Sequence, residues 1–206
     1  AQHRSQASTP HSSTVLVEHA GRDPNGDPLG EPTETFVSSS TIQFSSTGGQ
    51  IHLDLIADGV YAADLDGTPL DPAAFSHNRF PFTTEPGTHE ITVTALCRYS
   101  HSGEGLHRFV DPADGKVYLY TQFEIADARR MYADFEQPDQ KMTFELQVIA
   151  PTGWTIVSNS PAPEPTEGPW EGMSRWSFEP TLPISTYLTA LDAGEYHVDH
   201  GTIHRA

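Results

Sequence analysis

Three histidines near the C-terminus have the residue type and spacing of metal ligands. His197, His200 and His204 are separated by two and three residues, so a helix or compact turn here would gather three imidazole nitrogens. No fourth protein ligand is evident, and terminal residues are often disordered. We therefore treat them as weak candidates for a metal site and favour surface histidines.

An acidic segment near the N-terminus faintly resembles a calcium-binding loop. Asp23, Asn25, Asp27 and Glu34 could offer oxygen ligands, but Pro28 stands where such a loop needs glycine, and no flanking helices are expected. A solvated turn is the better interpretation.

The single cysteine, Cys97, ends the alternating run Ile91–Cys97. One cysteine cannot form an internal disulfide, so stability must come from packing. No neighbouring histidine or basic residue is evident to lower its pKa, and we expect a buried, unreactive thiol.

The longest motif-rich part of the chain begins at Gly103. Its short sequence motifs, in order along the chain, are Gly103–Phe109, Tyr120–Glu124, Asp127–Arg130, Phe135–Pro138 with Lys141, Trp154 with Ser158-Asn159, Trp176–Pro180 and Pro183–Leu188. This series closely resembles the N-terminal domain of the aminopeptidase N family of zinc exopeptidases, particularly its actinobacterial members. The resemblance is good from about Ile51 to His197. It departs at Asp134, where a small residue or cysteine is more usual, and at Glu136, where aspartate is.

The resemblance implies a zinc peptidase reaction, but this chain lacks the motifs that the reaction needs. In the family, two histidines and a glutamate hold zinc, and a second glutamate is the general base of an H-E-x-x-H motif. The only His-Glu pair here, His89-Glu90, is followed by Ile91-Thr92-Val93, and the G-A-M-E-N substrate loop is also missing. We expect no catalytic residue and no cofactor in this chain, with zinc belonging to a catalytic domain of the parent enzyme.

The resemblance also assigns a binding role to Gln122 and Glu124. The matching family positions help to hold the α-ammonium group of the peptide substrate, which has three donors and suits a carboxylate with a carbonyl. Residues i and i+2 of a strand share a face, so both side chains can act together while Phe123 faces the opposite way. Close by, we expect Arg129 and Arg130 to form an internal salt-bridged turn with Asp127 and Glu136.

Composition limits the partners. With 11 Lys and Arg against 28 Asp and Glu, the formal charge is −17, which disfavours nucleic acid and anionic membranes. No run approaches the roughly 18 apolar residues that span a bilayer, and no signal peptide is evident. We expect no membrane partner and a cytoplasmic location, with secretion left open.

Short alternating runs punctuated by Gly, Pro and Asp predict an all-β fold, an antiparallel β-sandwich of the saddle-like aminopeptidase N type. Asp66-Gly67 and Asp114-Gly115 predict tight turns between strands. The only credible helical stretch is 126–135. The predicted strands are Thr41–Phe44, Ile51–Ile56, Val60–Leu65, His107–Val110, Lys116–Glu124, Met142–Ala150, Thr155–Asn159, Arg175–Glu179 and Tyr187–Ala193.

We divide the chain into an irregular N-terminal segment, residues 1–34, and a β domain, residues 35–206. The first segment has one candidate strand, Ser13–His19, followed by a stretch rich in turn formers. Since the family places an early core strand here, the first sheet is expected to be incomplete, differently paired or completed by another chain.

Two functions remain open at this point. One is the substrate-anchoring N-terminal domain of a zinc aminopeptidase that removes N-terminal residues from peptides, with peptide amino termini and a zinc catalytic domain as partners. The other is a self-standing, non-catalytic module that binds proteins or peptides. For the second function, apolar surface that a catalytic domain would otherwise cover would favour a homo-oligomer.

Overall fold

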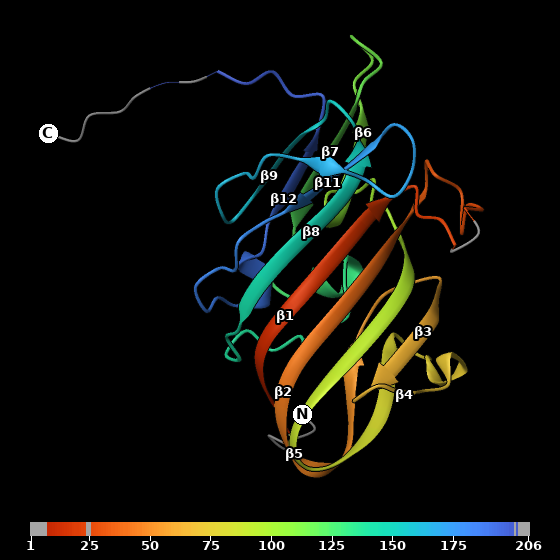
Figure 1. Cartoon of the computed structure of the whole chain (residues 1–206), viewed down its shortest axis with the longest axis vertical. Helices are drawn as coiled ribbons and strands as arrows, with labels where there is room; N and C mark the ends of the chain where they lie inside the picture. Colours follow the sequence, from red (N-terminus) through yellow and green to blue (C-terminus); the bar gives the residue numbers. More distant parts are fainter. Residues whose placement is uncertain (1–7, 24–25, 200, 202–206) are drawn as a thin grey trace, which may run out of the picture.

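The computed structural model describes residues 8–23, 26–199 and 201. Two sheets make up the fold (Figure 1). The larger sheet has the strand order β10-β11-β8-β1-β2-β5-β3-β4, and the smaller has the order β6-β7-β12-β9. The predicted all-β sandwich is confirmed, with β1 and β8 as a parallel pair in a mostly antiparallel arrangement.

The strands are β1 (Ser8–His19), β2 (Thr35–Asp54), β3 (Gly59–Leu65), β4 (Thr68–Pro69), β5 (Arg79–Arg98), β6 (Gly105–Val110), β7 (Val117–Gln122), β8 (Thr143–Pro151), β9 (Thr155–Ser158), β10 (Thr166–Glu167), β11 (Met173–Ser177) and β12 (Leu191–Gly194). Three short 3-10 helices complete the described elements: η1 (Pro72–Ala74), η2 (Ala128–Arg130) and η3 (Thr186–Leu188). None of the described helices is long and apolar enough to cross a membrane.

The N-terminal strand differs from the prediction. Residues 8–19 are not irregular but form β1, which lies inside the larger sheet, antiparallel to β2 and parallel to β8. Its inward residues Val15 and Val17 are almost fully buried. The candidate strand Ser13–His19 therefore exists and extends back to Ser8, because pairing on both sides satisfies its backbone despite a polar sequence. The domain division at residue 34 remains a prediction.

The predicted strand Thr41–Phe44 and the first part of the predicted strand Ile51–Ile56 belong to one continuous strand, β2, which ends at Asp54. It pairs with β5 from Thr35 to Asp54, and Gly49 pairs with Thr84 while Gly48 is skipped in the register. Glycine is required at residue 48, where φ is +90° and a Cβ atom would lie 2.9 Å from the ring of Pro86. The long β2 and β5 ribbon gives the larger sheet its extended lower part (Figure 1).

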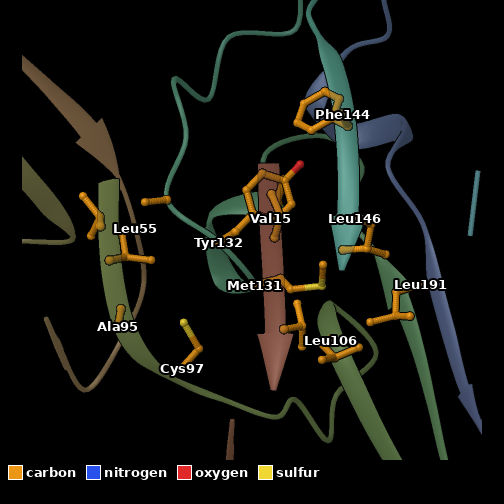
Figure 2. Close-up of a cluster of buried hydrophobic side chains, with 14 of the residues drawn as sticks. Val15, Leu55, Ala95, Cys97, Leu106, Met131, Tyr132, Phe144, Leu146 and Leu191 are labelled. Carbon is orange, nitrogen blue, oxygen red and sulfur yellow. The ribbon is translucent and has the colours of Figure 1, made fainter. Parts of the chain in front are cut away.

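The stretch 126–135 is not a regular helix, and only η2 within it is helical. Its side chains are needed between the sheets instead: Met131, Tyr132 and Phe135 are each at most 2% exposed. Figure 2 shows Met131 and Tyr132 among side chains that include Val15 of β1 and Leu106 of β6. Tertiary packing therefore overrides the local helical preference of this segment.

Serines occupy three inward positions of the larger sheet. Ser13, Ser38 and Ser40 are each at most 2% exposed, and none of their hydroxyls has a hydrogen-bond partner. A buried hydroxyl without a partner costs about 1–3 kcal/mol in desolvation. These positions therefore lower the stability of the sheet.

This predicts an unusual response to alanine. Ser40→Ala is expected to leave the free energy of unfolding unchanged or to raise it by about 1 kcal/mol, because the substitution removes an unpaired polar group. The matched control is Ser46→Ala on the same strand, which breaks a 2.7 Å bond to Thr84 and a 3.0 Å bond from the Gly48 amide. Urea denaturation measures both. If Ser40→Ala lowers the free energy of unfolding as much as Ser46→Ala does, the prediction is wrong.

Candidate functional site

Gln122 is the last residue of β7, and Glu124 is the second residue after it. Both side chains are exposed, whereas Phe123 between them is 1% exposed. The Glu124 amide donates to the Gln122 side-chain oxygen at 3.4 Å. The Glu124–Ile125 peptide bond is cis, and Ile125 is 69% exposed. The Gln122 side chain therefore contacts the Glu124 backbone, and both side chains are open to a partner.

Phe123 fixes this turn to the interior. Its ring lies edge-on to Tyr132 with centroids 6.2 Å apart, and its carbonyl accepts a hydrogen bond from the Asp127 amide at 3.0 Å. Asp127 in turn accepts from the Arg130 Nε at 2.7 Å. These contacts leave Gln122 and Glu124 on a braced turn rather than on a free loop.

The predicted salt-bridged turn is confirmed for Arg130 and Asp127 but not for the side chains of Arg129 and Glu136. Arg129 donates through its Nε to the Ala126 carbonyl at 2.9 Å. Glu136 instead accepts from the Arg129 backbone amide and from the Thr186 hydroxyl, both at 2.9 Å. Burial raises the pKa of this carboxyl. Glu136 therefore joins the turn to η3 mainly through hydrogen bonds.

Gly105 lets the turn approach β6 closely. It pairs with Gln122 and has a φ of +69°. A Cβ atom here would lie 2.9 Å from the Cβ of Arg130. Any larger residue would displace either η2 or the end of β7.

The outer face of the smaller sheet is rich in aromatic side chains. Phe109 and Tyr120 are 46% and 39% exposed, and the Tyr118 ring lies 5.0 Å from that of Tyr196. We call these four residues the aromatic face. Tyr118, Tyr120 and Gln122 alternate along β7 and so lie on one side of it. The candidate ammonium-binding residue Gln122 therefore lies at the edge of the aromatic face.

Sequence reasoning missed this surface. The signal was available, because Tyr118 and Tyr120 are two residues apart in a predicted strand and Phe109 is in the strand paired with it. Asp192 lies opposite Tyr120 on β12, and burial raises its pKa. Large contiguous patches of exposed apolar side chains are found at protein interaction sites.

The metal-ligand candidates do not form a described centre. His197 contacts Asp199 with 3.1 Å between Nε2 and Oδ1, whereas His200 and His204 lie outside the described residues. Within the described part of the chain, no group of three or more His, Cys, Asp or Glu residues could hold a metal ion. The residues of this structure therefore provide no fit for zinc, and no catalytic step can be assigned to them.

The remaining candidates have structural roles. The Asp23 carboxylate accepts from the Asp27 amide at 2.9 Å, as in a polar turn, while Asn25 lies outside the described residues. Cys97 is fully buried and unpaired with another cysteine, and burial raises the pKa of its thiol to about 12. That thiol is unreactive at neutral pH.

Comparisons with known proteins show the family of this chain. Residues 72–188 match the Peptidase M1 N-terminal domain. Aminopeptidase N of Streptomyces lividans is 49% identical over 170 residues, covering 81% of this chain and 19% of that protein. Aminopeptidase N of Acetobacter pasteurianus is 37% identical over 133 residues, covering 62% and 37%. The enzyme of that name from Bos taurus is 34% identical over 114 residues, covering 53% and 12%.

The chain belongs to the Peptidase M1 N-terminal domain family. Its fold is the β-rich domain expected from the sequence, and it carries Gln122 and Glu124 in an exposed, braced turn. It spans 19% of the length of the Streptomyces relative, so the activity of that whole protein does not follow from this domain alone.

Proposed function

We propose that this chain is the substrate-anchoring N-terminal domain of a zinc aminopeptidase and is catalytically incomplete by itself. The observation that carries the proposal is that the side chains of Gln122 and Glu124 are both exposed on one turn, where the Glu124 backbone amide donates to the Gln122 side-chain oxygen at 3.4 Å. A carboxylate and an amide oxygen together can accept the donors of a peptide α-ammonium group. Zinc and the general base would come from the catalytic domain of the parent protein.

The aromatic face supports the second half of the proposal. It is contiguous with Gln122 along β7, so a catalytic domain seated on it would bring its own groups next to the anchoring pair. Covering Phe109 and Tyr120 would remove apolar surface from water, at about 25 cal/mol per Å² buried. We therefore place the zinc domain against the aromatic face.

The proposal is tested by domain replacement. The matching segment of Streptomyces lividans aminopeptidase N is exchanged for this chain, and hydrolysis of an aminoacyl chromogenic substrate is compared with that of the Streptomyces protein lacking the segment. We expect the fusion to be active and both the truncated protein and this isolated chain to be inactive, with or without zinc. Turnover by the isolated chain would overturn the assignment of catalysis to another domain.

The alternative is a self-standing module that binds a protein or peptide. The same aromatic face favours it, because two copies could cover each other through Phe109 and Tyr120. Light scattering of the isolated chain separates the two functions when combined with the fusion assay. A stable dimer that contributes no activity to the fusion would favour the module.

A further inference from the structure

An arginine without a polar partner lies at one end of the space between the two sheets. Arg108 is on β6, on the same side of the strand as Leu106, which is fully buried. It pairs with Leu119 of β7, which is 3% exposed. Arg108 therefore projects toward the interior, while its neighbours His107 and Phe109 face outward.

The Nε of Arg108 is unpaired. This atom is buried and has no hydrogen-bond partner, whereas the residue as a whole is only partly buried. Every other described arginine donates to an oxygen atom; these are Arg22, Arg79, Arg98, Arg129, Arg130 and Arg175. In a chain of net charge −17, an arginine that contacts no acidic side chain is unusual. We therefore expect it to bind an acidic group from elsewhere.

The neighbouring polar groups do not supply the missing negative charge. His19 and Tyr99 share a 2.6 Å hydrogen bond, and the His19 ring lies 4.8 Å from that of Trp154. Burial and the nearby charge of Arg108 lower the pKa of His19 to about 4. Burial raises the pKa of the Tyr99 hydroxyl well above its usual value. Both groups are therefore neutral at neutral pH, and Arg108 is the single charge of this cluster.

We propose that Arg108, beside His19, Tyr99 and Trp154, forms a binding site for one carboxylate that comes from outside this chain. A planar guanidinium matches the two oxygens of a carboxylate in a bidentate pair. One uncompensated positive charge balances one carboxylate, whereas a phosphate dianion would leave excess negative charge in a protein that is already strongly acidic. The carboxylate has two sources, a free small acid or an acidic side chain of a fused or partner polypeptide.

The first measurement uses the isolated chain and sodium acetate as the probe. Nuclear magnetic resonance follows the Arg108 Nε–Hε signal while acetate replaces chloride at constant ionic strength. We expect a saturable shift with a dissociation constant of about 1 mM, the range of a single weak contact. Arg108→Lys keeps the charge but loses the bidentate geometry, and acetate should bind it several-fold more weakly, as judged from the Trp154 indole signal.

The second measurement separates the two sources. If the ligand is a free acid, acetate raises the Tm of the Streptomyces fusion as much as that of the isolated chain. If a polypeptide carboxylate already occupies the site in the fusion, acetate leaves its Tm unchanged and Arg108→Gln lowers it. Either result supports carboxylate binding. The proposal is overturned if the wild-type chain shows no saturable acetate shift, or if it responds to phosphate as strongly as or more strongly than to acetate. Both measurements use the wild-type chain, so neither depends on the folding of a variant.

Discussion

Replacing Glu124 with alanine in the active Streptomyces fusion is expected to lower kcat/KM for peptide substrates about 100-fold, which corresponds to ~2.7 kcal/mol. The reason is the loss of a charge-assisted contact with the substrate ammonium in a site from which water is partly excluded. Glu124 is exposed and makes only a 3.4 Å backbone contact with Gln122. The substitution should therefore leave the Tm of the domain nearly unchanged.

The matched variants make this result specific. Glu124→Gln keeps the shape and the acceptor oxygen of the side chain but removes the charge. It should therefore lower kcat/KM less than Glu124→Ala does. Glu171→Ala removes an exposed acid from the turn before β11 and should leave kcat/KM unchanged. If the fusion is active and Glu124→Ala retains full kcat/KM, the ammonium-binding role is wrong even though the domain assignment stands.

The local parts of this fold follow from the sequence. At Asp66-Gly67 the φ angles are +54° and +77°, and the turn joins β3 to β4 as the dipeptide predicts. Gly115 likewise has a φ of +73° between β6 and β7. Phe123 is buried between exposed Gln122 and Glu124 as the alternating pattern predicts, although β7 ends at Gln122 and not at Glu124 as expected. Each of these features depends on residues within a few positions of one another.

The parts that were missed depend on distant pairing. β1 is polar at many positions, and its place in the sheet is fixed by β2 and by the parallel contact with β8, more than a hundred residues away. The stretch 126–135 loses its helical form because Met131 and Tyr132 are needed in the core. The link from Glu136 to Thr186 could not be inferred from spacing either. All three features depend on contacts between residues that are far apart in the sequence.

The partly buried His19 should make the protein sensitive to acid. Its pKa is about 4 in the folded protein against a usual value of 6.5, mainly because of burial. Below pH 6.5 the unfolded chain binds a proton that the folded chain does not, so stability is complete above that pH and falls as the pH drops toward 4. At 1.36 kcal/mol per pKa unit, the loss attributable to His19 is about 3 kcal/mol.

The test compares urea unfolding of wild type and His19→Gln between pH 7 and pH 4. Two other groups act in the direction opposite to His19: burial raises the pKa of Glu136, and the hydrogen bond that His89 donates to the Asp66 carboxylate raises the pKa of His89. Both shifts favour the folded state on acidification. Taking the difference between the two proteins cancels these contributions. The free energy of unfolding of His19→Gln should therefore rise relative to wild type by about 3 kcal/mol over this range. His11→Gln, an exposed substitution on the same strand, should follow the wild-type curve; parallel curves for wild type and His19→Gln would mean that His19 accepts its proton in the folded protein as readily as in the unfolded one.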